Sequence, residues 1–195
     1  MSGPLVLTGS QTVGPFFERA LTREDAVRHV LVGPETTGDR VRIQGQLFDG
    51  DGQPVPDGLI EIWQANAHGR YNHPADTRSD LPLDPEFLGF GRCGTDEDGG
   101  FWFETVKPGR IPLDGTLQAP HIVVTVFSRG LLNHCVTRVY FADDPALQDD
   151  PILQRVPADR RSTLLAQPQG IDGAVQGYRW DVHLQGAGET AFFNV

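Results

Sequence analysis

The chain has 195 residues, of which 38% are hydrophobic, and its 26 acidic and 16 basic residues give a formal net charge of −10. This length suits one domain with a core of its own, so we expect residues 1–195 to form a single unit. Acidic charge spread along the sequence argues against a surface that binds nucleic-acid phosphates.

Short alternating runs separated by glycine and proline predict an all-β sandwich. We expect strands at residues 41–48, 59–65, 101–106, 121–127, 134–141, 178–185 and 191–194. The clearest case is 178–185, where apolar Tyr178, Trp180, Val182 and Leu184 alternate with polar residues, as in a half-buried strand.

Few segments of the sequence have the features of a helix. Residues 22–25 can cap a short helix, and residues 157–167 offer a second one. Residues 66–94 have no clear periodicity and are rich in Gly, Pro, Asp and His, which predicts a long loop packed over a sheet. Long ordered loops of this kind are usually functional or lie at interfaces.

We expect neither a signal peptide nor a membrane-spanning helix in this sequence. The first fifteen residues have no basic region or sustained apolar run, and no stretch approaches the ~20 apolar residues of a spanning helix. Cys93 and Cys135 could pair, but a domain of this size does not require a disulfide. We therefore expect a cytoplasmic protein.

The common enzyme motifs are absent: there is no G-x-S-x-G elbow, no cysteine pair with zinc spacing and no G-x-G-x-x-G opening a helix. The lone histidines His29, His68 and His183 are expected to be solvated or hydrogen-bonded. Aromatic residues in strands more often pack than bind ligands, so five of them are assigned to the core, namely Tyr140, Tyr178, Trp180, Trp63 and Trp102.

Five phrases follow one another in a recognisable order: Trp63-Gln-Ala-Asn-Ala-His-Gly-Arg-Tyr71, Lys107-Pro-Gly109, Ala119-Pro-His-Ile122, Arg138-Val-Tyr-Phe141 and Tyr178-Arg-Trp-Asp181. Together they resemble the intradiol ring-cleaving dioxygenases, and the match runs from Ser10 to the C-terminus. The resemblance implies a β-sandwich core with long loops and one or two short helices, in agreement with the strand pattern.

Catalytic subunits of that family bind Fe(III) through two tyrosinates and two histidines, a hard anionic set. By the resemblance, Tyr71 and His121 fall at two of the four ligand positions, while Ile111 and Val123 replace the other two. Residues two apart on a strand share a face, so an H-x-H pair could hold one ion, but His121-Ile-Val123 cannot. We expect no metal in this chain, with Tyr71 and His121 hydrogen-bonded to each other or filling a closed pocket.

The resemblance therefore implies a non-iron α subunit in an αβ hetero-oligomer whose β subunit carries Fe(III). That complex would use O₂ to cleave 3,4-dihydroxybenzoate to 3-carboxy-cis,cis-muconate in aromatic catabolism. Residues 1–40 would form an arm that packs on the β subunit.

Residues that line the substrate entrance shared with β would be Thr12, Gly14, Pro15 and Arg129. Of these, Arg129 would lie toward the carboxylate of the substrate. The alternatives are a turn packed under Phe16 and Phe17 for the first three residues, and an ordinary surface arginine for Arg129.

Two other functions stay open from the sequence. One is a self-sufficient dioxygenase in which His73 or His134 completes an altered metal shell. The other is a non-enzymatic β-sandwich module that binds a ligand or a protein partner.

Overall fold

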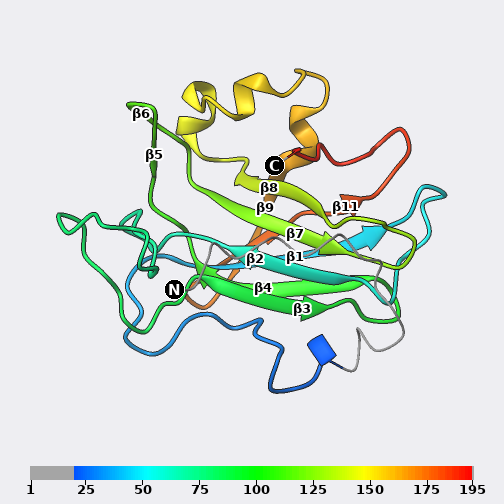
Figure 1. Ribbon diagram of the computed structural model, residues 1–195, viewed down its shortest axis with the longest axis horizontal. Helices are drawn as coiled ribbons and strands as arrows, with labels where there is room; N and C mark the ends of the chain where they lie inside the picture. Colours follow the sequence, from blue (N-terminus) through cyan, green and yellow to red (C-terminus); the bar gives the residue numbers. More distant parts are fainter. Residues whose placement is uncertain (1–19, 195) are drawn as a thin grey trace, which may run out of the picture.

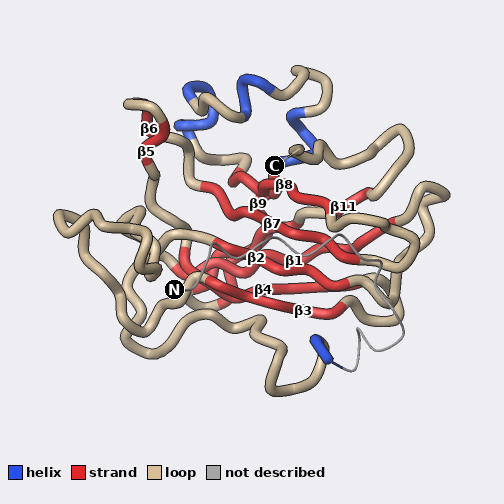
Figure 2. The backbone as a smooth tube through the Cα atoms, viewed as in Figure 1, coloured by secondary structure: helices blue, strands red, loops and turns tan. Residues whose placement is uncertain are grey.

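The computed structural model describes residues 20–194, and strands dominate it (Figures 1 and 2). The strands in chain order are β1 (Arg40–Phe48), β2 (Leu59–Trp63), β3 (Phe90–Gly94), β4 (Gly100–Val106), β5 (Pro112–Leu113), β6 (Thr116–Leu117), β7 (His121–Phe127), β8 (Cys135–Phe141), β9 (Leu165–Asp172), β10 (Val175–Arg179) and β11 (Val182–His183). Three short 3-10 turns lie between β8 and β9, namely η1 (Pro145–Asp149), η2 (Leu153–Arg155) and η3 (Arg161–Leu164).

Two layers of strands form the body of the fold. The first layer runs β3-β2-β7-β8 with antiparallel pairing throughout. In the second layer β1 pairs with β4 antiparallel and with β10 and β11 parallel. Strand β9 joins the layers, since it pairs with β8 at one end and with β10 along its length. The predicted all-β sandwich is confirmed.

Period-2 alternation builds the core between the two layers. In β1 the buried positions alternate with more exposed ones, and in β7 the residues Ile122, Val124 and Val126 point into the same core. A second, smaller core lies on the other side of β8, between that strand and the 3-10 turns. It contains Ala119, Tyr140, Leu153, Val156 and Leu164. One face of the first layer therefore looks toward the main core, while the other face is left for the site described below.

Five predicted strands agree with the structure: β1, β2, β4, β7 and β8 match their expected ranges to within two residues at each end. The predicted strand 178–185 is divided, because Asp181 interrupts the ladder between β10 and β11. The Asp181 carboxylate accepts a hydrogen bond from the Gln46 main-chain N–H at 2.9 Å, in place of a backbone partner. The predicted strand 191–194 is wrong except for an isolated bridge between Val136 and Phe193.

Four strands appear where none was expected: β3, β9 and the two-residue strands β5 and β6, which pair only with each other. Strand β3 lies inside the predicted loop 66–94. Its small residues give no apolar alternation. Gly91 is needed there because a Cβ at this position would approach Ile62 and Leu31 to within 3 Å. Strand β9 begins at Leu165, inside the predicted helix 157–167, of which only the 3-10 turn η3 exists. Most of β9 is exposed and polar, so it lacks the apolar signal of a strand.

The short helix that residues 22–25 were expected to cap is absent: the segment forms a turn, closed by the Ala26 and Val27 main-chain N–H groups, which donate to the Arg23 carbonyl. Helical structure in the described residues is otherwise confined to the 3-10 turns and to residues 20–21, where the description begins. Residues 28 and 30, within the predicted arm, form bridges to this chain's own Arg92 and Glu104.

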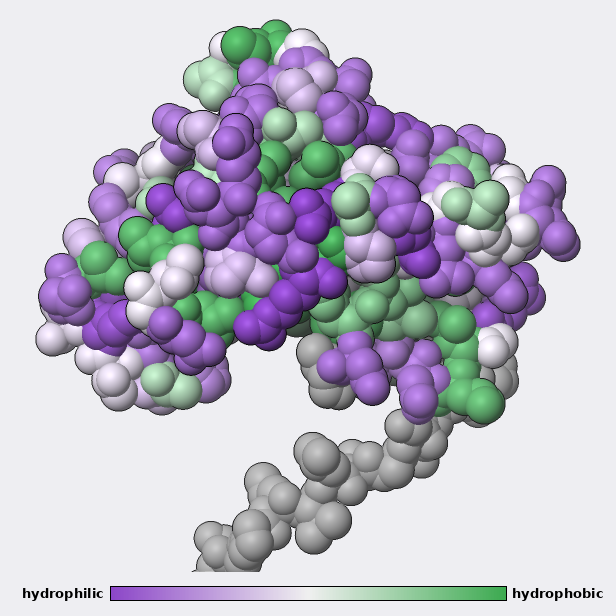
Figure 3. Space-filling model, turned by 90° about the horizontal axis from the view of Figure 1, so that it is seen from above, coloured by the Kyte–Doolittle hydropathy of each residue, from purple (hydrophilic) through white to green (hydrophobic). Residues whose placement is uncertain are grey.

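Hydrophilic residues cover most of the face seen from above, with hydrophobic groups gathered between them (Figure 3). Large hydrophobic side chains are exposed at scattered positions, of which Leu132 and Ile171 are the most exposed. Cys93 and Cys135 are both free thiols. Among the described residues, none of the helical segments has the length and hydropathy needed to cross a bilayer.

Candidate functional site: a modified metal pocket

The register of three strands places the candidate site on the outer face of the first layer. Val123 of β7 pairs with Trp63 of β2 on one side and with Arg138 of β8 on the other. Two residues before Val123 on the same strand, His121 pairs with Tyr140. Because directly opposed residues point to the same face, Trp63, Val123, Arg138, His121 and Tyr140 share that face.

Tyr71 reaches this face from the loop after β2. Its ring stacks on Trp63, with centroids 5.6 Å apart and planes 13° from parallel. The Tyr71 main-chain N–H donates to Asp76 Oδ2 at 2.8 Å, which fixes the loop beneath the ring. Arg78 binds the same carboxylate through Nε and Nη2 and holds the pKa of Asp76 well below its usual range. Burial raises the pKa of Tyr71, so its phenol is neutral at pH 7.

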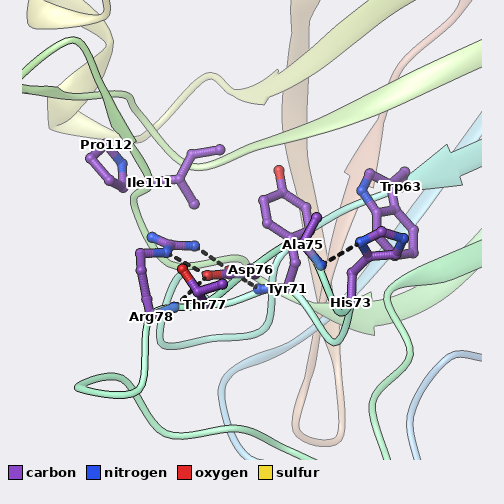
Figure 4. A pocket seen from close by; sticks show the side chains of 9 residues that line it. All are labelled: Trp63, Tyr71, His73, Ala75, Asp76, Thr77, Arg78, Ile111 and Pro112. Atoms are coloured by element: carbon purple, nitrogen blue, oxygen red, sulfur yellow. Dashed lines mark hydrogen bonds and ion pairs between the residues drawn. The ribbon is translucent and has the colours of Figure 1, made fainter.

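A cavity of about 550 Å³ opens beside Tyr71. Figure 4 shows Tyr71, Trp63 and His73 on one side of it and Ile111 with Pro112 on another. Tyr71 is partly buried and lines an open cavity. We expected Tyr71 and His121 to fill a closed pocket, but Tyr71 lines an open one.

Ile111 is brought to the cavity by a tight contact between two loops. The Gly109 main-chain N–H donates to the Asn66 carbonyl at 2.9 Å. A Cβ on Gly109 would lie 2.4 Å from the Gly69 nitrogen, so only glycine permits this approach. Ile111, the residue that the resemblance sets at a ligand position, therefore lies at the cavity wall, where it presents an aliphatic side chain.

His121 is 5% exposed and neutral. Its Nδ1 lies 2.8 Å from the Ala119 carbonyl oxygen, and because a carbonyl only accepts, Nδ1 carries the proton. Burial, together with the positive charge of Arg138, lowers the pKa of His121 to about 4. The Tyr140 ring lies next to it, with centroids 5.6 Å apart. No hydrogen bond joins His121 to Tyr71 within the described residues.

A polar network continues from His121 into the smaller core. Arg138 Nη1 donates to Gln118 Oε1 at 2.7 Å and lies 3.5 Å from the Tyr140 hydroxyl. That hydroxyl donates to Asp150 Oδ1 at 3.2 Å. Asp150 is fully buried and also accepts main-chain N–H groups from Ala119, Ile152 and Leu153 at 2.7–3.0 Å. Burial and the Asp150 carboxylate raise the pKa of Tyr140, while Arg138 opposes that shift.

These residues do not fit a ferric ion. Tyr71 and His121 supply two donors, and the side chains at positions 111 and 123 have no lone pair to offer. The described residues contain no group of three or more His, Cys, Asp or Glu that could hold a metal ion.

The two other histidines considered for a metal shell do not complete it. His73 lies near the cavity, edge-on to Trp63, but it is exposed and its Nδ1 accepts the Ala75 main-chain N–H. His134 lies against Phe127, at the opposite end of β7 from His121.

Arg129 is also at the far end of β7 from His121. Its side chain is 74% exposed, and its Nε forms an ion pair with Asp57 Oδ2 at 2.5 Å. It therefore has no part in the Tyr71 cavity of its own chain. Thr12, Gly14 and Pro15 lie outside the described residues.

A family model described as "Dioxygenase" matches residues 12–186. The chain belongs to the intradiol dioxygenase family. It is 44% identical to the protocatechuate 3,4-dioxygenase alpha chain of Burkholderia cepacia, covering 96% of this chain and 97% of that one. It is 37% identical to the beta chain from the same organism, covering 93% of this chain and 77% of that one.

Among solved structures, the dioxygenase domain of a dioxygenase carbohydrate-binding protein fusion from Streptomyces sp. SirexAA-E superposes with a TM-score of 0.64 at 24% identity. The match covers 96% of each chain. At that identity the likeness shows the fold, which is the sandwich described above.

Sequence reasoning missed three residues of the site. Trp63 was assigned to the core, but it is only partly buried and forms the cavity wall. Arg138 was quoted within a family phrase without a role. Asp150 carried no motif, although aspartate is a residue whose side chain commonly accepts main-chain N–H groups two or three residues later, as it does here from Ile152 and Leu153.

Proposed function

We propose that this chain is the alpha, non-iron subunit of a protocatechuate 3,4-dioxygenase. The observation that carries the proposal is the combination of alpha-chain likeness along nearly the whole chain with aliphatic Ile111 and Val123 at two of four ligand positions. A family member that keeps the fold but cannot hold iron needs a partner that does. Fe(III) would be held by a beta subunit, and none would be bound here.

In the proposed complex, beta cleaves 3,4-dihydroxybenzoate with O₂ to give 3-carboxy-cis,cis-muconate, in the cytoplasm. This chain would wall the substrate entrance with Thr12, Gly14, Pro15 and Arg129. The exposure of Arg129 supports that role. Asp57 pairs with Nε, and 74% of the side chain is exposed, so the guanidinium is accessible to a carboxylate, which it favours binding in a forked geometry.

The other two functions have less support. A self-sufficient dioxygenase needs further ligands near Tyr71 and His121, and His134 lies at the wrong end of β7 while His73 is turned to Trp63 and Ala75. A binding module without a partner would leave the likeness to the alpha chain unexplained.

The deciding experiment is to express this chain alone and together with a beta subunit, and to measure iron content, visible absorbance and ring cleavage. We expect a colourless, inactive lone chain and a coloured complex with about one iron per αβ pair, because tyrosinate bound to Fe(III) absorbs visible light. Stoichiometric iron and turnover in the lone chain would overturn the proposal. A stable lone monomer that does not associate with beta would support the binding module instead.

A further inference from the structure

Arg138 lies among the residues that remain from the metal site. It is directly opposite Val123, the position at which the family has its second histidine ligand. Its positive charge acts on Tyr71 and His121, the two remaining ligand residues: it contributes to the lowered pKa of His121 and opposes the rise that burial causes in the pKa of Tyr71. A cation is thus already present on the same face of the sheet as His121 and Val123.

The guanidinium is held in this position by neutral groups. Nη1 donates to the oxygen of Gln118, which is 3% exposed, and lies beside the Tyr140 hydroxyl. The aromatic ring of Phe193 covers it, with the guanidinium carbon 5.9 Å from the ring centroid. These contacts hold the guanidinium beside Tyr140, with the side chain partly buried.

The charge of Arg138 also has a counterpart in the smaller core. Asp150 is fully buried, and its carboxylate is connected to Arg138 through the Tyr140 hydroxyl. A positive charge near this end of β7 therefore offsets a buried negative one. A ferric ion placed beside the guanidinium would instead bring like charges together in a partly buried site, where their repulsion is poorly screened.

We propose that the Arg138 guanidinium takes the place of the metal cation and keeps iron out, so that restoring the missing ligands alone would not restore metal binding. The inference deepens the proposed function, since it concerns why the alpha subunit is free of iron.

Four complexes with the same beta subunit test it: the native chain, Ile111→Tyr with Val123→His, and that pair combined with either Arg138→Lys or Arg138→Gln. Iron per αβ pair and visible absorbance are measured in each, and ring cleavage by beta confirms that the complex has assembled. We expect about one iron in the first three complexes and about two in the Arg138→Gln complex. Lysine is the matched control, because it keeps the charge while changing the shape.

Two results would overturn the inference. One is a second iron in the Ile111→Tyr, Val123→His complex that still contains Arg138. The other is an assembled, active Arg138→Gln complex that stays at one iron. If Ile111→Tyr prevents assembly, Val123→His with and without Arg138→Gln leaves three ligands that can be probed with Co²⁺ by its absorbance, with the same two criteria.

This test is separate from that of the proposed function. The native complex and the lone chain report whether iron belongs to beta. The difference between the Arg138→Lys and Arg138→Gln complexes reports only what the guanidinium does.

Discussion

Strand β7 begins at His121, which is 5% exposed, and ends at Phe127, two residues before Arg129, whose side chain is 74% exposed. At the first end, His121 packs against the Tyr140 ring, and the Tyr140 hydroxyl donates to the buried Asp150 carboxylate. At the second end, a cation held by one exposed ion pair faces outward. One end of the strand is therefore buried in a polar network, while the other end carries an exposed cation.

The comparison predicts two kinds of mutational effect. Substitutions at the His121 end should change the free energy of unfolding with little effect on substrate recognition. Substitutions at the Arg129 end should change recognition of the substrate carboxylate with little effect on stability. The predictions below test this division in order of expected size.

Replacing Asp150 should have the largest effect. Asp150→Ala leaves three main-chain N–H groups and the Tyr140 hydroxyl without their acceptor in a fully buried site. We expect a loss of about 3–5 kcal/mol in the free energy of unfolding, measured by urea denaturation of the assembled complex at fixed concentration. Asp149→Ala, at the exposed neighbouring residue, is the matched control and should cost below about 0.5 kcal/mol. Equal effects for the two variants would show that the network does not stabilise this end.

The acid sensitivity of His121 should come next. Its folded pKa of about 4 lies below the unfolded value of about 6.5, so the unfolded chain takes up a proton first as the pH falls. The stabilisation is complete above pH 6.5 and is lost as the pH falls toward 4. At pH 5 we expect this histidine alone to cost about 2 kcal/mol relative to pH 8.

The measurement compares the urea midpoint from pH 8 to pH 5 in the native chain and in His121→Asn, which keeps a donor for the Ala119 carbonyl. The variant should show the shallower dependence on pH. His68→Asn changes an exposed loop histidine and should leave the dependence as it is in the native chain. Identical slopes for the native chain and His121→Asn would contradict the buried, neutral state of His121.

The fold could be predicted from the sequence wherever burial imposes alternation. Strands β1 and β7 have one buried face and clear apolar periodicity, so their ranges were correct. Strand β3 could not be found, because its close packing requires glycine at position 91 and removes the apolar signal. Strand β9 is mostly exposed, so its sequence is polar and was assigned partly to a helix.

For the site, the sequence allows predictions about residues that can be assigned one at a time. The ligand positions of Tyr71, His121, Ile111 and Val123 are predictions from resemblance to a known pattern, and the structure brings Tyr71 and Ile111 to one cavity. The role of Arg138 could not be assigned in this way, because it depends on the register that sets it opposite Val123, and that register comes from the pairing of two strands. Asp150 is similar, since its partners at 119, 140, 152 and 153 meet only in the folded chain.

At the exposed end, Arg129→Ala should change recognition of the substrate. Loss of a charge-assisted bond to the substrate carboxylate should raise KM for 3,4-dihydroxybenzoate by about tenfold or more in the complex. Iron content and the urea midpoint should not change, because the side chain is mostly exposed. Inhibition by 4-hydroxybenzoate should weaken in parallel, while inhibition by phenol, which has no carboxylate, should not. Arg155→Ala is the control, and an unaltered KM in Arg129→Ala would remove this arginine from the substrate entrance.

The smallest effect is expected from Asp57→Asn, which removes the anion that orients Arg129. The pair is solvent-exposed, with 32% of the Asp57 side chain accessible, and such pairs contribute about 0.2–1 kcal/mol. We therefore expect KM to rise by about threefold with kcat unchanged, because the guanidinium loses orientation but keeps its charge. Asp25→Asn, in the exposed pair with Arg23, should leave KM unaltered. A fall in KM would instead mean that Asp57 competes with the substrate carboxylate for Arg129. The cation at the Arg129 end of β7 would then be restrained by its ion pair, as Arg138 is by its contacts near the His121 end.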